Sequence, residues 1–336
     1  MATIEEQVLA VEEEIHKTPY NKATQHHIGK LKAKLARLKD EQEKRQARGK
    51  GGGPRYAVRK SGNATVGIVG FPSVGKSTLL NAITAATSEV AAYDLTTLEV
   101  IPGILEYRGA KIQILDMPGL IRGASKGRGR GREVISVARG CDLVLLMIDV
   151  FETNVPVLAE ELYSAGIRLN ARPPDVVIKK RNRGGVNLNS TVPLTKVSVE
   201  TIEAVVREFG HLNADVVIRQ DITQDELVDV LATNRVYIPT VVVLNKIDLV
   251  GGEYLREVEK RLTSWRVVPI SAERKEGLDR LKEEIYRSLR FIRIYMKPQG
   301  KEADLKEPLI VKQGSTVGMV CDALHREFRE KFRYAN

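Results

Sequence analysis

The stretch ATVGIVGFPSVGKSTLLNAITAA, residues 64–86, decides the fold. It contains the pattern Gly-x-x-x-x-Gly-Lys-Ser between Gly70 and Ser77, directly after an apolar strand and at the start of a helix expected from about Lys76. The glycines let the backbone curl so that successive N–H groups face an anion, and the helix N-terminus adds its dipole. The stretch therefore predicts a phosphate-binding loop at the edge of an α/β sheet.

Within this loop, we expect the ammonium of Lys76 to neutralise β- and γ-phosphate oxygens, and the hydroxyl of Ser77 to bind Mg²⁺. A glycine-rich turn between a strand and a helix that binds nothing is the alternative. The residues of this stretch expected to bind nucleotide are Gly70, Phe71, Pro72, Ser73, Val74, Gly75, Lys76, Ser77 and Thr78.

Beyond residue 86, short apolar runs alternate with helical stretches. The runs are ATVGIV, KIQIL, LVLLMI, TVVVLN and RVVPI, and the helices are expected near 131–139, 154–165, 253–263 and 277–289. Continuous apolar strands separated by helices are typical of a parallel sheet that is covered on both faces. The sequence therefore predicts an α/β fold with a mostly parallel sheet.

Two later motifs indicate which nucleotide base the protein binds. In NKID, the carboxylate of Asp248 can accept both N–H groups that guanine presents and adenine lacks, while Lys246 can lie along the base plane and Asn245 can tie this loop to the phosphate loop. In SAE, which spans Ser271, Ala272 and Glu273, the backbone N–H of Ala272 is expected at guanine O6. Each motif follows an apolar strand, at the edge where open α/β sheets bind ligands. Together they favour guanine over adenine nucleotides.

The motif DMPG and the stretch LTTL (95–98) supply the remaining site residues. We expect Asp116 to hold Mg²⁺ through a water molecule, and the N–H of Gly119 to meet the γ-phosphate. Thr97 is expected to reach Mg²⁺ from a switch loop, with Thr96 as the second choice; strand formation is the alternative role of these threonines. The predicted catalytic residues are Lys76, Thr97 and Gly119, and the predicted Mg²⁺ ligands are Ser77, Thr97 and Asp116.

Composition and charge limit the class of protein. The 336 residues are 43% apolar and 29% charged, as in globular domains, and the longest apolar run, LVLLMI, is too short to span a bilayer. With an acidic start and no secretory signal, the sequence predicts a cytoplasmic protein without membrane contact. The two cysteines, Cys141 and Cys321, have no metal-binding spacing.

The formal charge of +10 is concentrated near the N-terminus, where residues 22–60 contain 13 Lys or Arg and 3 acidic residues. Apolar residues at positions 4, 8, 11 and 15 and again at 28, 31, 35 and 38 predict two amphipathic helices folded as a hairpin. A segment of this charge attracts polyanions such as RNA; a solvated helix face is the alternative. The hairpin is therefore a candidate RNA-binding arm.

The sequence divides into six expected parts. They are a basic helix-turn-helix arm (1–50), a linker (51–63), the first part of the nucleotide-binding domain (64–167), an inserted α+β subdomain (168–236), the second part of the nucleotide-binding domain (237–290) and a small C-terminal β-rich domain that stops part-way (291–336).

The motifs GFPSVGKST, AAYDLTTLEVIPG, DMPGLIRGASKGRGRGREV, NKID and SAE together resemble the Obg superfamily of GTPases. The basic hairpin, the insertion and LIVKQGSTVGMVCDALHREF are similar to the developmentally regulated GTP-binding (DRG) branch of archaea and eukaryotes. The resemblance covers nearly the whole chain. It implies an insertion of the S5D2L type, a C-terminal TGS domain of β-grasp fold, here truncated, and a role in translation on ribosomes or polysomes.

Leu120 stands where Ras-like GTPases have the glutamine that orients the attacking water. We therefore expect slow intrinsic turnover, with the water positioned by a backbone group, by a monovalent cation such as K⁺, or by a partner; Ser73, where many cation-dependent relatives have Asn, weighs against the cation. The charges that follow are expected to attract RNA phosphate or the nucleotide. They are Arg122, Lys126, Arg128, Arg130 and Arg132. We favour a mobile, solvated loop that becomes ordered on a partner over an arginine finger within the chain.

The sequence thus favours a Mg²⁺-dependent GTPase that binds GTP and GDP, acts as a monomer, and contacts the ribosome or ribosomal RNA and a stabilising partner protein. One alternative is an RNA-associated protein that uses GTP as a structural ligand with negligible turnover. An Obg-like GTPase of ribosome assembly would carry the same motifs. An ATPase or nucleotide kinase conflicts with NKID.

Overall fold

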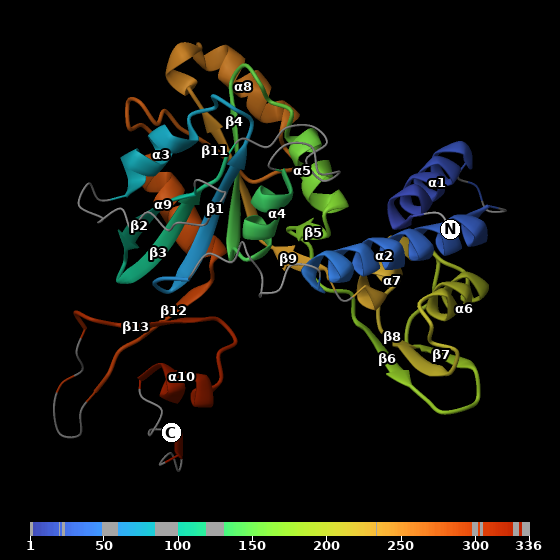
Figure 1. Ribbon diagram of the computed structural model, residues 1–336. Helices are drawn as coiled ribbons and strands as arrows, with labels where there is room; N and C mark the ends of the chain where they lie inside the picture. Colours follow the sequence, from blue (N-terminus) through green and yellow to red (C-terminus); the bar gives the residue numbers. More distant parts are fainter. Residues whose placement is uncertain are drawn as a thin grey trace. The chain divides into compact units, whose positions relative to one another are not determined.

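The computed structural model describes residues 3–19, 21, 24–48, 60–84, 100–118, 131–232, 234–297, 302, 305–324 and 329–330. The chain divides into two compact units. We call Met1–Arg55 with Ala171–Tyr237 the arm unit, and Tyr56–Asn170 with Ile238–Asn336 the sheet unit. Figure 1 shows the elements of both, and each unit is described by itself below.

Among the described residues, six strands form the main sheet of the sheet unit, in the order β11-β10-β4-β1-β3-β2. Their bounds are β1 Ala64–Gly70, β2 Ile101–Tyr107, β3 Ala110–Asp116, β4 Leu143–Asp149, β10 Thr240–Asn245 and β11 Val267–Pro269. All neighbours pair in parallel except β2, which is antiparallel to β3. The predicted α/β fold with a mostly parallel sheet is confirmed; strand β2 was not predicted.

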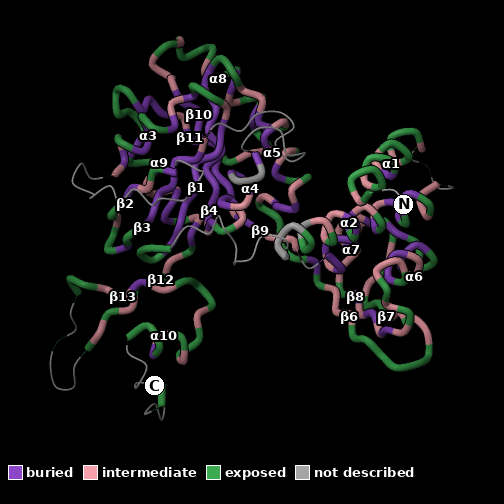
Figure 2. Tube along the Cα trace, in the orientation of Figure 1, coloured by how far each residue is buried: buried purple, intermediate pink, exposed green. Residues whose placement is uncertain are grey.

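Helices cover both faces of this sheet, which explains why every residue of β1 and β4 is buried. One face packs against α3 (Lys76–Ile83) and α9 (Leu278–Ser288), and their apolar side chains share one core with those of β1, β3, β4 and β10. On the other face lie α4 (Gly131–Arg139) and α5 (Val155–Ser164), and α8 (Gly252–Arg261) precedes β11. Figure 2 shows the buried strands at the centre of the unit.

The arm unit contains the predicted helix pair, α1 (Ile4–Lys17) and α2 (Gln25–Arg48). A capping box of Thr3 and Glu6 begins α1, and Val11 packs against Leu31 and Leu38 of α2. The remaining elements come from the insertion: α6 (Val199–Glu208), α7 (Gln224–Leu231) and the sheet β6-β8-β7, formed by Val176–Lys180, Ala214–Ile218 and Val186–Ser190.

Helix α2 also packs against α6 and α7. Its Ala33 and Ala36 are buried in one apolar cluster with Ile202 and Val205 of α6. Small side chains at these positions let the two helices approach each other closely. The hairpin and the insertion, far apart in the sequence, thus share a core.

At the C-terminal end, β12 (Phe291–Ile294) and β13 (Leu309–Lys312) form an antiparallel pair, and α10 (Val317–Leu324) follows. Ile310 is buried in the core of the sheet unit, and Phe291 stacks edge-to-face on Tyr286 of α9. Two further short strands are β5 (Ile167–Leu169) and β9 (Val236–Ile238). Within the described parts of the chain, no helix is long and apolar enough to cross a membrane.

Candidate functional site

The phosphate loop, which we define as residues 70–77, connects β1 to α3. Gly75 begins α3 in the left-handed region with φ of 96°, and a Cβ there would lie 2.5 Å from Nδ2 of Asn245. A Cβ on Gly70 would lie 2.2 Å from the backbone oxygen of Met147. Both glycines are therefore required by the local backbone. Between them Phe71 is partly buried, Pro72 and Ser73 are exposed, and Val74 is buried; Thr78 is exposed on α3.

Lys76 lies inside the curl of this loop. Its side chain is buried, and its ammonium donates to the backbone oxygens of Phe71 at 2.9 Å and Gly70 at 3.4 Å. Burial lowers the pKa of Lys76, and the negative charge of Asp116 partly offsets this effect. A phosphate in the loop would supply this partly desolvated cation with anionic oxygens in place of neutral carbonyls.

Ser77 and Asp116 meet where β3 ends. The hydroxyl of Ser77 donates to Oδ2 of Asp116 at 2.5 Å. Within the described structure, Oδ1 of Asp116 is buried and has no hydrogen-bond partner. Burial raises the pKa of Asp116, whereas the hydrogen bond from Ser77 and the charge of Lys76 act in the opposite direction.

The donors at this point fit a Mg²⁺ ion. Mg²⁺ takes oxygen ligands, uses one or two protein groups and keeps several waters, and it is completed by the phosphates of its substrate. Ser77 offers a hydroxyl, and Asp116 offers a carboxylate with one unsatisfied oxygen that a metal-bound water could reach. No cluster of three or more His, Cys, Asp or Glu side chains occurs among the described residues.

Asn245 joins three loops. It is buried at the end of β10, its Nδ2 donates to the backbone oxygen of Val74 at 2.9 Å, and its Oδ1 accepts the N–H of Ala272 at 3.0 Å. The sequence pointed only to the first of these bonds. Because the N–H of Ala272 donates to Asn245, it would have to be shared with guanine O6 in the predicted contact.

The side chain of Lys246 turns back toward the phosphate loop. Its backbone is left-handed, with φ of 63°, and its ammonium donates to the backbone oxygen of Ser73 at 3.0 Å and to Oδ2 of Asp149 at 2.5 Å. Asp149 was not among the predicted site residues. The available signal was an acidic residue at the carboxyl end of a buried parallel strand, where open α/β sheets bind ligands.

Asp248 lies in a short 3-10 turn, Ile247–Leu249, after Lys246. The hydrogen bond from the Ser271 side chain holds the pKa of Asp248 below its usual value, against the effect of burial, and the guanidinium of Arg274 acts in the same direction as Ser271. The carboxyl group is therefore ionised at neutral pH and can accept two N–H donors. Ser271 is fully buried, while Glu273 is exposed.

The switch residues cannot be placed in the same way. Thr96, Thr97, Gly119 and Leu120 lie outside the described residues, as does the loop 121–130. Asp116, Lys76 and Ser77 are brought together, and Asn245 and Lys246 contact the same phosphate loop. The phosphate loop and the NKID loop, which is predicted to bind the base, are thus linked by direct hydrogen bonds.

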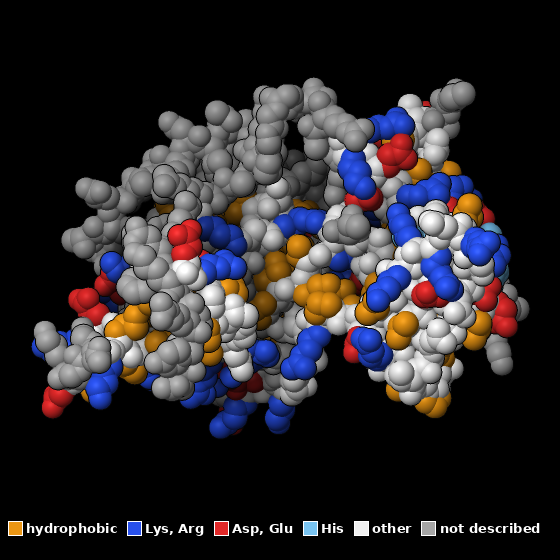
Figure 3. All heavy atoms as spheres, turned by 90° about the horizontal axis from the view of Figure 1, so that it is seen from below, with side chains coloured by type: hydrophobic (Ala, Val, Ile, Leu, Met, Phe, Trp, Pro, Cys, Tyr) orange, Lys and Arg blue, Asp and Glu red, His pale blue; other side chains and the backbone are white. Residues whose placement is uncertain are grey.

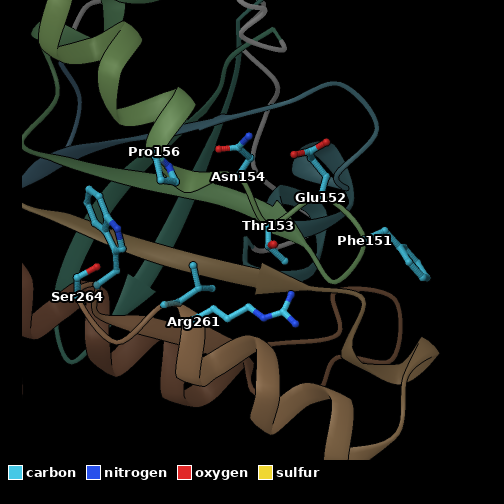
Figure 4. Close-up of a pocket in the computed structure, with 9 residues that line it drawn as sticks. Phe151, Glu152, Thr153, Asn154, Pro156, Arg261 and Ser264 are labelled. Atoms are coloured by element: carbon cyan, nitrogen blue, oxygen red, sulfur yellow. The ribbon is translucent and has the colours of Figure 1, made fainter.

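A separate hollow of about 470 Å³ opens beside the segment that follows Asp149. Its lining comes from the β4–α5 loop and from the end of α8, including Thr153, Arg261 and Trp265. Figure 4 shows Thr153 and Arg261 facing each other across it, while the side chain of Phe151 points away. None of the predicted site residues lines this hollow.

Most of the described Lys and Arg side chains of α2 are paired with acids. Figure 3 shows Lys and Arg side chains mixed with Asp and Glu on the surface of the arm. Among the described side chains of α2, the ion pairs of Lys and Arg are Lys32–Asp225 at 2.7 Å, Arg37–Glu208 at 3.5 Å, Lys39–Glu12 at 2.9 Å, Lys44–Asp40 at 2.6 Å and Arg45–Glu41 at 2.8 Å. Lys30 and Lys34 are exposed and make no ion pair with any described residue. Part of the charge excess is therefore neutralised within the arm unit.

Comparison with known proteins assigns the family. The family described as 50S ribosome-binding GTPase matches residues 65–180, a C-terminal region of the same domain matches 183–291, and the TGS domain matches 292–336. A GTP-binding protein of Methanocaldococcus jannaschii is 56% identical over 99% of this chain and 85% of its own length. Developmentally-regulated GTP-binding protein 1 of Xenopus laevis is 43% identical over 98% of this chain and 90% of its own length.

The chain belongs to the DRG family. Developmentally-regulated G-protein 3 of Arabidopsis thaliana, 44% identical over all of this chain and 91% of its own length, is a further member. The predicted resemblance is confirmed, as are GTP binding at the level of the family and the C-terminal TGS domain. The roles of the individual site residues of this chain stay predictions.

Proposed function

We propose that this DRG protein is a Mg²⁺-dependent GTPase that hydrolyses GTP to GDP and phosphate and acts as a monomeric switch on ribosomes during translation, in the cytoplasm. The carrying observation is the contact of Ser77 with Asp116 inside a phosphate loop that Asn245 and Lys246 join to the base-recognition loop. Family membership supports GTP binding. The hydrolysis of GTP and the action on ribosomes are what we propose beyond it.

Binding would begin with exchange of partners in the phosphate loop. Lys76 would leave the carbonyls of Gly70 and Phe71 for β- and γ-phosphate oxygens, and the backbone N–H groups of the loop would surround the β-phosphate. Asp248, ionised and accepting, would take the two N–H groups of guanine. Specificity for the base would then come from Asp248, and most of the affinity from the phosphates.

In hydrolysis, a water oxygen attacks the γ-phosphorus in line while the bond to the β–γ bridging oxygen breaks, giving GDP and phosphate. Ser77, Asp116 and Thr97 would hold Mg²⁺, which neutralises phosphate charge when bound. Lys76 would stabilise the charge that develops on the same oxygens, and the N–H of Gly119 would contact the γ-phosphate. Leu120 supplies no group that orients the water, so we expect K⁺, a backbone group or the ribosome to do so.

The test is single-turnover hydrolysis of radiolabelled GTP, with and without purified ribosomes, in K⁺ and in Na⁺. We expect slow basal release of phosphate that ribosomes accelerate. Acceleration by K⁺ alone would assign the positioning of water to a cation. Tight GTP binding with no hydrolysis under any condition would contradict the proposal and favour GTP as a structural ligand.

Ribosome contact through the arm is tested by charge removal at Lys30 and Lys34, the exposed lysines of α2 without an ion-pair partner among the described residues. We expect Lys30→Ala/Lys34→Ala to weaken ribosome or RNA binding and to lower the slope of log K against log salt by roughly 1 to 2. The control is Arg256→Ala/Lys260→Ala, the same charge change at the same spacing on α8. Equal slopes for both variants would show that the arm does not bind RNA through these residues.

A further inference from the structure

Among the described residues, Asp149 is a buried carboxylate that contacts the NKID loop and that the proposed mechanism does not use. It ends β4, a strand whose residues are all buried, and only 8% of its side chain is exposed. A charge at such a position is costly unless each oxygen has donors. The contacts of its two oxygens therefore indicate what the carboxylate does.

The two oxygens of Asp149 serve different loops. Oδ1 accepts the backbone N–H groups of Phe151 at 3.0 Å and Glu152 at 2.9 Å, which fixes the turn after β4. Oδ2 accepts the ammonium of Lys246 at 2.5 Å. The carboxylate thus joins its own turn to the loop that is expected to hold guanine.

Lys246 extends this connection to the phosphate loop. Its ammonium, bound to Asp149, also donates to the backbone oxygen of Ser73 at 3.0 Å. The backbone of Lys246 is left-handed, and its single ammonium group contacts acceptors from two different loops. These two contacts restrict the side chain of Lys246.

We propose that Asp149 is a positioning residue for guanine nucleotides: it holds Lys246 against the phosphate loop, so that the base-binding and phosphate-binding loops are joined before the ligand binds. This inference rests on the proposed assignment of NKID to the base. Asp149 acts through Lys246 and does not contact the nucleotide. Its effect is therefore on affinity and lifetime of the complex, and selectivity among purines stays with Asp248.

The substitution Asp149→Asn removes the charge of the side chain and keeps its shape. Both oxygens of Asp149 only accept hydrogen bonds. An amide has a single acceptor oxygen, so it either directs its NH₂ group at the ammonium of Lys246 or directs it at the N–H groups of Phe151 and Glu152. The ion pair is lost in both orientations, while the volume of the side chain is unchanged.

The experiment measures the release of fluorescent mant-GDP from the full chain after addition of excess GDP. From the size of one charge-assisted hydrogen bond, we expect Asp149→Asn to release it about 10- to 100-fold faster than wild type. The control is Asp142→Asn, at the opposite end of β4, where Asp142 also binds a lysine, Lys312, at 2.6 Å. We expect the control to release mant-GDP at the wild-type rate.

A double-mutant cycle with Lys246→Met separates positioning from general damage to the fold. If Asp149 acts only through Lys246, the double variant releases mant-GDP no faster than the faster single variant. The ratio of GDP to xanthosine diphosphate affinity should equal that of wild type. If Asp149→Asn does not fold, Asp149→Ser takes its place in the cycle, because its hydroxyl can still accept from the following N–H groups.

Three results are distinguishable. Wild-type chain that does not bind mant-GDP would refute the proposed function itself. Tight binding by wild type with wild-type release from the Asp149 variant would overturn this inference alone. Multiplicative effects of the Asp149 and Lys246 substitutions would also overturn it, since they would show that the two side chains act independently.

Discussion

Replacing Gly29 by alanine tests whether α2 and the insertion are one cooperative structure. Gly29 lies inside α2, where this change ordinarily stabilises a helix by about 1 kcal/mol. Here the new Cβ would lie 1.8 Å from Nε2 of Gln224 and 3.1 Å from Cγ2 of Thr201. Because the arm packs against the insertion, we expect Gly29→Ala to destabilise the arm unit instead of stabilising it.

The magnitude follows from the displaced groups. Nε2 of Gln224 donates to the backbone oxygen of Gln25 at 3.0 Å, and the Gln224 side chain is buried. Moving this amide loses a hydrogen bond worth about 1 kcal/mol and leaves a buried donor that costs about 1–3 kcal/mol. Crowding against Thr201 adds to the loss. After subtracting the gain in helix propensity, we expect Gly29→Ala to destabilise the arm unit by about 1–3 kcal/mol.

Because unfolding of a chain with two compact units need not be two-state, the assay is amide hydrogen exchange of α2 and α6 followed by mass spectrometry. The expected loss corresponds to exchange that is about 5- to 150-fold faster in both helices. The control is Gly318→Ala in α10, where a new Cβ meets nothing nearer than 3.8 Å. We expect this substitution to slow the exchange of α10 or to leave it unchanged. Slower exchange of α2 in Gly29→Ala, or faster exchange confined to α2, would refute the shared packing.

Two further predictions concern single carboxylates. Hydrogen bonds from Lys312 and from a backbone N–H outweigh burial and hold the pKa of Asp142 below the ordinary 3.8. Since this folded-state pKa is depressed, the stabilisation is present above pH 3.8 and is lost as pH falls through the folded-state value. In urea unfolding, Asp142→Asn should thus be less stable than wild type at pH 7, with a difference that disappears at strongly acidic pH; a constant difference would contradict the ion pair. At the base site, Asp248→Asn should shift preference from guanine to xanthine nucleotides in competition binding, and unchanged selectivity would refute its assignment.

The parts of the fold that follow local patterns could be predicted. Strands such as LVLLMI are read directly because a parallel sheet buried on both faces needs continuous apolar runs. The helix pair at the N-terminus is visible because amphipathic spacing marks one buried stripe. The phosphate loop has little freedom, because its glycines are imposed by backbone approach and by a left-handed φ.

Strand β2 escaped prediction because its pattern is not that of the other strands. IPGILEY contains Pro102 and Gly103, both unfavourable in strands, and is only partly buried at the edge of the sheet. It is held by pairing with β3 through a two-residue turn, in which Arg108 and Gly109 both have positive φ, 49° and 81°. That turn is the kind favoured in hairpins, and x-Gly after an alternating run was the available signal.

Apart from the contact of Asn245 with the phosphate loop, contacts between distant residues could not be predicted. Asp149 and Lys246 are 97 positions apart, and nothing in the local sequence of either shows that their side chains meet. The second hydrogen bond of Asn245, to Ala272, depends likewise on where two loops lie in the folded sheet. Motifs give the residue types needed for the chemistry, whereas the partners that orient them follow from the topology.

The charge of the arm illustrates the same limit in energetic terms. A count over residues 22–60 treats each lysine and arginine as available to a polyanion. In the folded arm unit, Lys32 and Arg37 instead contact acids of the insertion, Asp225 and Glu208, so an RNA phosphate would have to compete with a carboxylate already in place. Replacing a carboxylate by a phosphate as the partner of such a cation gains little binding free energy. RNA binding is driven by the release of counterions, and this applies to cations that are solvated before contact. The affinity of the arm for RNA should therefore depend on fewer positions than its sequence suggests.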